Sequence, residues 1–150
     1  MDDGAVKRVR ALKERQAKKP FSVIAPSKAW VERNCVLSSE AKKFLREKLP
    51  GPFTLVLEMR GQCVAKSVSC APGSLGVRIP RHWFSRVVAK AGVPFVTTSA
   101  NLAGGKNASG LSDLPESVLQ GVDVVVFEGV KKGKPSRVLD FSCGEARRLR

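Results

Sequence analysis

Short apolar segments typical of β-strands alternate along this chain with segments of helical periodicity. FTLVLEM (residues 53–59), LGVRI (75–79) and VPFVTTS (93–99) are rich in branched and aromatic residues, which favour strands. SSEAKKFLREKL (38–49) has apolar residues at helical spacing, which predicts a helix with one buried face. Several connections are too short for a regular right-handed strand–helix–strand crossover. We therefore expect an α/β domain with an open, twisted, mixed β-sheet and flanking helices rather than a Rossmann fold.

The remaining segments complete this pattern. Asp2 and Asp3 are placed to begin a short helix, where acidic side chains favour the helix N-terminus, and Pro20 requires that helix to end before it. FSVIA (21–25) then predicts a buried strand, and Ser27 is placed to cap a small helix. The other expected elements are helices at 82–92 and 112–120, strands at 122–127 and 136–141, and one more strand in the C-terminal tail.

Length and composition indicate one domain. A chain of 150 residues is long enough for one core, and no repeat or linker divides it, so we expect a single domain over residues 1–150. No apolar run approaches the roughly 20 residues of a membrane span, so no membrane contact is expected. The N-terminal residues lack the apolar core of a secretory signal. The four cysteines form no CxxC pair and the single His82 lies near none of them, which argues against a zinc site and favours a reducing cytoplasm.

Positive charge is in large excess and is unevenly distributed. There are 27 Lys and Arg against 13 Asp and Glu, a formal net charge of +14. Residues 1–20 and 131–150 carry seven cations each, whereas residues 107–130 contain acidic residues but no Lys or Arg. This distribution favours a polyanionic partner, either nucleotide phosphates or RNA, without defining a reaction.

Four of the cations lie together in LKERQAKKPFS (residues 12–22). On a helix, side chains two residues apart point roughly 200° apart, whereas in an extended segment they point to the same side. Because the following proline ends the helix, we expect Lys13 and Arg15 to lie in extended chain and to grip a phosphate. The alternative is that both are solvated surface residues. Lys18 and Lys19 are expected to be solvated or to contact RNA.

A polar cluster follows the apolar strand at 93–97. Thr98, Ser99 and Asn101 lie in TTSAN, just before a glycine-containing loop. Ser99 and Asn101 are two residues apart, so a hydroxyl and an amide would face the same way. Strand ends of this kind carry ligand sites in α/β folds. Ordinary turn hydrogen bonding is the alternative explanation.

Two further positions stand out. Arg78 lies in the middle of an apolar strand, and arginine is rarely buried without a partner; either it lines a cleft that holds an anion, or its strand has a solvent-facing side. Ser136 begins a strand after a Gly-Lys-Pro turn, and arginines crowd the C-terminus up to Arg150. The chain has no P-loop and no GxGxxG, and with one histidine no plausible Ser-His-Asp or Cys-His arrangement. The site is therefore expected to work by charge and positioning rather than by a covalent nucleophile.

The chain contains, in this order, KER with KKPFSV, LPGPFTLVL, LGVRIP, TTSAN and GKPSRVLD. With these motifs it resembles the threonylcarbamoyl-AMP synthase family, with its YrdC-type domain, from about residue 5 to residue 150. The resemblance implies an open twisted α/β sheet around a basic cleft. It implies a nucleotidyltransferase that joins L-threonine, bicarbonate and ATP, with Mg²⁺ sharing the phosphate charge. The products would be pyrophosphate and threonylcarbamoyl-adenylate, which feeds tRNA threonylcarbamoyladenosine modification. It also implies RNA binding.

The resemblance assigns roles by motif. The KxR pair (Lys13, Arg15) and the SxN pair (Ser99, Asn101) would be catalytic. The implied nucleotide-binding residues are Lys13, Arg15, Ser22, Arg78, Thr98, Ser99, Asn101, Ser136 and Arg150, with no metal ligand from the protein.

The chain departs from the family at two places. It begins at the helix that follows a family segment similar to Thr-Asp-Thr-x-Tyr-Gly-Leu, so we expect an N-terminally truncated domain. Three explanations remain open: a longer natural chain, a second chain or second copy that completes the site at an exposed strand edge, or a non-catalytic RNA- or nucleotide-binding module of the same fold. A related carbamoyl transfer, as in hydrogenase maturation, is a further alternative. The second departure is Arg137, where the family tends to have a small hydroxyl residue.

Overall fold

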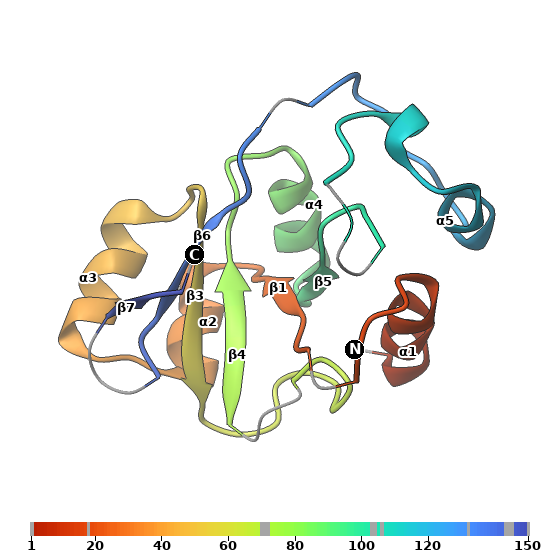
Figure 1. The fold of residues 1–150 in the computed structure, drawn as a ribbon. Coiled ribbons are helices and arrows are strands. Elements are labelled where there is room, and N and C mark those ends of the chain that lie inside the picture. The colour runs from red at the N-terminus through yellow and green to blue at the C-terminus, as the bar shows by residue number, and fades with distance from the viewer. Residues whose placement is uncertain are drawn as a thin grey trace.

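A mixed β-sheet organises the domain (Figure 1). The computed structural model describes residues 2–17, 19–69, 73–102, 105, 107–131, 133–142 and 146–149. Its strands are β1 (Ser22–Ile24), β2 (Cys35–Val36), β3 (Phe53–Met59), β4 (Ser74–Arg78), β5 (Phe95–Thr97), β6 (Arg137–Asp140) and β7 (Arg147–Arg148). Their order is β5-β1-β4-β3-β6-β7, and β2 pairs with β3 beside this path. The β1–β4 and β3–β6 pairs are parallel and the others antiparallel, which confirms the predicted mixed sheet.

Helices flank this sheet, and three of the described ones begin with a capping side chain. Asp2 accepts the backbone N–H of Gly4, Ser27 that of Trp30 and Ser38 that of Ala41, which satisfies donors left open in a first helical turn. None of the described helices is long and apolar enough to cross a bilayer. The helices are α1 (Asp3–Leu12), α2 (Lys28–Asn34), α3 (Ser39–Lys48), α4 (Phe84–Ala91) and α5 (Glu116–Gly121), with a 3₁₀ turn at Leu111–Asp113.

The two faces of the sheet have different roles because side chains alternate along each strand. Leu55 and Leu57 of β3 are fully buried, as are Val23 of β1 and Val77 of β4. These side chains belong to the hydrophobic core, which also contains Leu45 of α3. Intervening residues of the same strands, among them Ser22, Thr54 and Gly76, line a cavity that is described below. One face is thus core and the other is available for a ligand.

One predicted strand does not form. Residues 122–127 were expected to be a strand because of their valines, but in the structure they have no regular secondary structure and lie outside the sheet. Val124 and Val126 are 76% and 67% exposed. A segment with strand propensity becomes a strand only where a partner supplies backbone hydrogen bonds. No described strand pairs with this segment. The strand predicted at 136–141 and the C-terminal strand do form, as β6 and β7.

The segment after α1 also differs from its prediction. The helix ends at Leu12, with Lys13 as its C-cap, and Glu14 adopts a left-handed φ of 49°. The chain therefore turns at Lys13 and Glu14, and the expectation that Lys13 and Arg15 lie in one extended segment was wrong. Pro20 does not determine where the helix ends, because the last helical residue, Leu12, lies well before it in the sequence.

Asp3 ties the start of α1 to the loop before β4, and this contact should make stability depend on pH. Its Oδ1 accepts the N–H of Ser67 at 3.0 Å, and Lys7 lies 2.9 Å from its other oxygen. The Ser67 hydrogen bonds, with Lys7, lower the pKa of Asp3 from 3.8 to about 2. A lowered carboxyl pKa adds stability that is fully present above the unfolded value and lost as pH falls through the folded one.

We therefore expect Asp3→Asn to lower the urea midpoint at neutral pH, and the difference from wild type to shrink as pH falls from about 5 to about 2. Urea titrations followed by circular dichroism at several pH values measure this difference. A gap that stays constant over the whole range would contradict the assignment.

Candidate functional site

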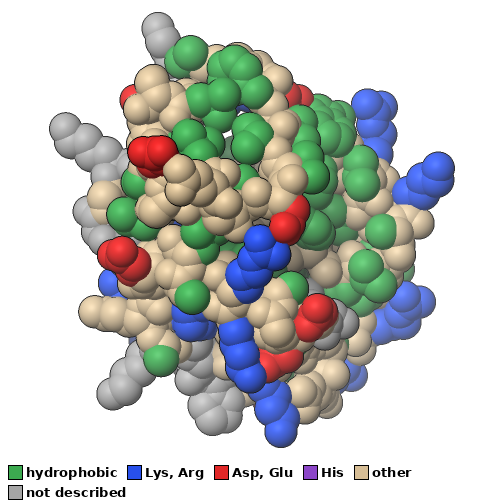
Figure 2. All heavy atoms as spheres, turned by 90° about the vertical axis from the view of Figure 1, so that its right-hand side faces the viewer, with side chains coloured by type: hydrophobic (Ala, Val, Ile, Leu, Met, Phe, Trp, Pro, Cys, Tyr) green, Lys and Arg blue, Asp and Glu red, His purple; other side chains and the backbone are tan. Residues whose placement is uncertain are grey.

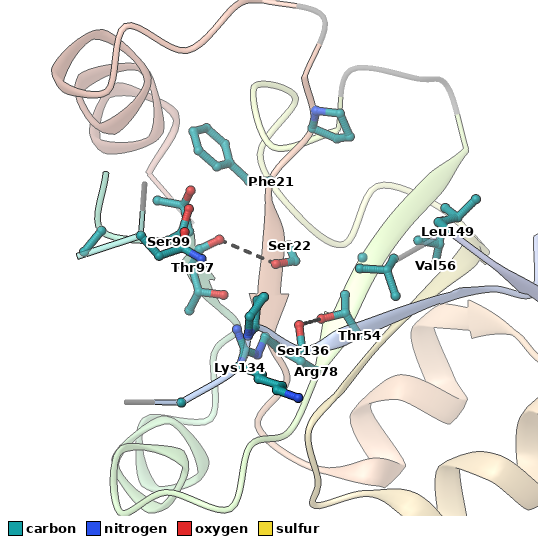
Figure 3. A pocket seen from close by; sticks show the side chains of 18 of the residues that line it. Phe21, Ser22, Thr54, Val56, Arg78, Thr97, Ser99, Lys134, Ser136 and Leu149 are labelled. Atoms are coloured by element: carbon teal, nitrogen blue, oxygen red, sulfur yellow. Dashed lines mark hydrogen bonds between the residues drawn. The ribbon is translucent and has the colours of Figure 1, made fainter. Parts of the chain in front are cut away.

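A cavity of about 630 Å³ lies against the open face of the sheet (Figure 3). Ser22, Thr54, Val56 and Arg78 reach it from three neighbouring strands, and the close-up shows their side chains facing the same space. The register explains this arrangement, because β1 and β3 both pair with β4. The described lining is Arg15, Pro20, Phe21, Ser22, Thr54, Val56, Ser74, Gly76, Arg78, Thr97, Thr98, Ser99, Ala100, Asn107, Ala108, Lys131, Gly133, Lys134, Pro135, Ser136, Val138 and Leu149.

The charged side chains of the described lining are all positive. Arg15, Arg78, Lys131 and Lys134 contribute cations, and none of the described lining residues is Asp, Glu or His. Seven Ser and Thr side chains supply neutral hydroxyls. The half-buried side chain of Arg78 lines the cavity, and the anion expected beside it stays a prediction. Cations and hydroxyls without a competing carboxylate are the kinds of group that suit an anion such as a phosphate.

Arg15 reaches the cavity from the turn after α1. Its Nη2 donates to the carbonyl of Pro20 at 2.8 Å and its Nε to that of Lys19 at 3.3 Å. Its guanidinium lies 5.0 Å from the ring centre of Phe21, close enough for a cation–π contact. Arg10 approaches the same ring at 4.6 Å. Arg15 is thus held at the cavity wall by contacts that fix its position.

Lys13, by contrast, is buried outside the described lining. Only 7% of the residue is exposed, and Nζ donates to the backbone carbonyls of Ser99 and Asn101. Burial lowers the pKa of Lys13, and the neighbouring Arg15 lowers it further. Lys13 and Arg15 therefore point to different partners: Lys13 holds the loop that follows β5, and Arg15 faces the cavity.

The SxN pair is brought together as its spacing suggested. The Ser99 hydroxyl donates to the side-chain oxygen of Asn101, whose amide donates to the carbonyls of Leu102 at 2.8 Å and Gly105 at 2.9 Å. Ser99 and Thr98 line the cavity, whereas Asn101 is outside the described lining. The turn bonding named as the alternative and a place at the cavity rim therefore coexist in one loop.

Two polar contacts connect the strands that form the cavity. The hydroxyl oxygen of Ser136, the residue before β6, lies 2.8 Å from that of Thr54 on β3, and both residues are buried. The Ser22 hydroxyl donates to the carbonyl of Thr97 at 3.5 Å. Ser22 and Ser136, both predicted, thus lie at the cavity. Arg150 is outside the described residues, as is Lys18; Lys19 is exposed.

Sequence reasoning missed several lining residues. Thr54 is a lone hydroxyl in an otherwise apolar start to β3, a signal that could have drawn attention. Lys131 and Lys134 lie in a turn rich in glycine and lysine. In such a turn the sequence does not distinguish a lysine that lines a cavity from one that is solvated. They reach the site because β6 pairs in parallel with β3.

The lining also bears on the expected Mg²⁺. Magnesium in proteins is usually held by one or two carboxylates together with substrate phosphates. The described lining has no carboxylate, and the described residues contain no group of three or more His, Cys, Asp or Glu side chains that could hold a metal. The donor set present does not fit a protein-held magnesium ion.

The sequence of this chain is similar to those of known proteins. The family model for Sua5/YciO/YrdC, described as "Telomere recombination", matches residues 1–150. A Methanocaldococcus jannaschii protein provisionally named threonylcarbamoyl-AMP synthase is 32% identical over 143 residues, which cover 93% of this chain and 65% of that protein. Threonylcarbamoyl-AMP synthase of Bos taurus is 38% identical over 101 residues, 67% of this chain and 35% of that protein.

A solved structure agrees in fold. P. abyssi Sua5, in its complex with L-threonine, superposes with a TM-score of 0.88 at 25% identity, over 99% of this chain and 44% of that one. The chain thus spans less than two thirds of the length of each of these relatives. With a family model that covers its full length and a fold to match, this chain belongs to the Sua5/YciO/YrdC family, the family of YrdC-type threonylcarbamoyl-AMP synthases.

Proposed function

We propose that this protein binds ATP, L-threonine and bicarbonate in the sheet-face cavity and forms threonylcarbamoyl-adenylate and pyrophosphate. The observation that carries the proposal is the lining, in which four cations and seven hydroxyls surround about 630 Å³ with no described carboxylate. Support comes from relatives named threonylcarbamoyl-AMP synthase and from a Sua5 that binds L-threonine. Use of the product in tRNA modification, and contact with tRNA, are parts of this proposal.

The reaction makes demands that the lining can meet. Threonine and bicarbonate condense to a carbamate with loss of water, and a carbamate oxygen then attacks the α-phosphorus of ATP while the bond to pyrophosphate breaks. The transition state spreads negative charge over phosphoryl oxygens, so the protein contributes mainly positioning and electrostatic stabilisation. In this proposal Arg15, Arg78 and Lys134 bind phosphate oxygens, and the hydroxyls of Ser22 and Ser136 line the same space. No covalent intermediate on the protein is needed.

The substrates fit the two kinds of surface in the cavity. Phe21, Val56 and Leu149 give it an apolar part, which suits the adenine ring or the threonine methyl group. The cations give it a polar part, which suits phosphates and the threonine carboxylate. Because the described lining does not fit a protein-held magnesium ion, no step of this proposal passes through a metal.

Lys13→Ala should reduce adenylate formation about 100-fold without unfolding the protein. Its ammonium holds the carbonyls of Ser99 and Asn101, and displacement of positioning groups by about 1 Å can cost about that factor. Asn101→Ala should have a similar effect, because its amide ties the loop to Leu102 and Gly105. Pyrophosphate release measures the rate, and circular dichroism checks the fold.

Lys19→Ala is the matched control, since it removes a lysine from the same segment at an exposed position outside the described lining. It should leave the rate unchanged. Wild-type turnover in the Lys13 and Asn101 variants would contradict the role given to this loop.

A further inference from the structure

Arg10, on α1, donates to three backbone carbonyls. Its Nη1 donates to the carbonyl of Gln16 at 2.8 Å and to that of Lys19 at 2.9 Å, and its Nη2 donates to that of Ser67 at 2.7 Å. Hydrogen bonds of this length from an ionised donor are among the stronger polar contacts in proteins. The half-buried Arg10 therefore connects α1 both to the turn that follows it and to the loop before β4.

The loop before β4 is bound to α1 through both backbone groups of Ser67. Asp3 accepts the Ser67 N–H at 3.0 Å, while Arg10 donates to the Ser67 carbonyl. Asp3 and Arg10 are seven positions apart in the sequence, so they lie on one face of the helix. The guanidinium of Arg10 is thus fixed by a contact that does not involve the turn after α1.

Arg15, which lines the cavity, uses groups that Arg10 also contacts. Its Nε donates to the Lys19 carbonyl at 3.3 Å, the same oxygen that Arg10 binds. Both guanidinium groups lie near the ring of Phe21, at 4.6 Å for Arg10 and 5.0 Å for Arg15, which are cation–π distances. Phe21 is itself part of the cavity wall (Figure 3). The position of Arg15 therefore depends on a carbonyl and a ring that Arg10 holds in place.

We propose that Arg10 is a positioning residue that fixes Arg15 at the cavity wall and thereby strengthens the binding of ATP phosphates. Arg10 is outside the described lining, so it acts through Arg15 rather than on the ligand. A side chain that is already ordered loses less conformational entropy when it binds a ligand. The effect on ATP rests on the proposed function, whereas the positioning of Arg15 can be measured without any ligand.

Arg8 of the same helix provides a matched control. Figure 2 shows the side of the molecule on which α1 and α5 lie, with several Lys and Arg side chains close to Asp and Glu side chains. Arg8 forms an exposed pair of this kind with Asp123, at 3.0 Å, and also donates to the carbonyl of Gly121. Exposed ion pairs contribute little to stability, and Arg8 and both of its partners are outside the described lining.

The side-chain Nε–H signals of arginine in the ¹⁵N-labelled full chain test the positioning by nuclear magnetic resonance. The signal that is absent from Arg15→Met identifies Arg15. Because its Nε donates to Lys19, this signal should exchange slowly with water in the wild type. Arg10→Met and Arg10→Lys should each shift it and raise its exchange rate, whereas Arg8→Met should leave it unchanged. An Arg15 signal that is the same in wild type and in Arg10→Lys would overturn the proposal.

Titration calorimetry with ATP measures the consequence for binding. Arg10→Met and Arg10→Lys should each weaken ATP binding about three- to tenfold, the cost of ordering one long side chain on binding. Lysine keeps the charge but lacks the fork that spans several carbonyls. Wild-type affinity in Arg10→Lys would therefore show that only the charge matters, which contradicts a positioning role. Arg8→Met should bind ATP as the wild type does.

A double-mutant cycle separates an effect through Arg15 from any other route. Arg15→Met alone should weaken ATP binding, and adding Arg10→Met should cost less than about twofold more. Losses that simply add would overturn the proposal. Circular dichroism checks the fold, and Arg10→Lys replaces Arg10→Met in the cycle if the methionine variant does not fold. If the wild type binds no ATP, the proposed function is wrong, and the Arg15 signal alone decides the role of Arg10.

Discussion

Replacing Arg78 by methionine is expected to weaken ATP binding about 10- to 100-fold while the fold persists. Arg78 ends β4, and its half-buried side chain lines a cavity with no described carboxylate. Hydrogen bonds to charged groups contribute about 1.5–3 kcal/mol each, and 1.4 kcal/mol is a factor of ten in affinity. Methionine keeps much of the apolar stem and removes the charge. Titration calorimetry with ATP measures the change.

Arg86→Met provides the control for net charge. Arg86 is exposed on α4 and is outside the described lining, so its replacement removes the same charge without touching the cavity. Its ATP affinity should stay near that of wild type. Equal affinities in the Arg78 and Arg86 variants would mean that the phosphates bind elsewhere.

Gly76→Val is expected to abolish ligand binding by filling the cavity from its floor. Gly76 lies between Ser22 of β1 and Val56 of β3 in the sheet register. A Cβ on this residue would lie 3.1 Å from the Cβ of Ser22 and 3.5 Å from Cγ2 of Thr54. Valine adds two further methyl groups on the ligand side. Overpacking of this kind costs about 1–3 kcal/mol of stability, so the protein should still fold.

Gly61→Val is the matched control, because a Cβ at Gly61 meets nothing within 4 Å. Calorimetry with ATP and with L-threonine measures binding, and urea titration measures stability. Gly76→Ala should fall between wild type and the valine variant. Ligand binding by Gly76→Val at wild-type affinity would show that the sheet-face cavity is not the site.

The sheet could be predicted because its strands carry their burial pattern in the sequence. In FTLVLEM, Leu55 and Leu57 alternate with residues of the other face, and the structure buries both leucines completely. The 122–127 segment, VDVVVF, is also rich in strand-favouring residues but has no partner strand among the described residues. The local sequence determines the propensity to form a strand. A strand also needs a neighbouring strand, whose position depends on other parts of the chain.

The site could be predicted in part for a related reason. Arg78, Ser22 and Ser136 were identified, and each lines the cavity. The geometry of Lys13 could not be foreseen, because the left-handed turn at Glu14 sends its ammonium toward the loop after β5. Spacing along the chain predicts which side chains share a direction only while the backbone conformation is known.

Pyrophosphate release from ATP by this 150-residue chain, with and without L-threonine and bicarbonate, tests the proposed synthase reaction most directly. The proposal predicts release that requires both co-substrates and is lost in Gly76→Val but retained in Gly61→Val. ATP binding without any release, or release that is indifferent to L-threonine and bicarbonate, would contradict it.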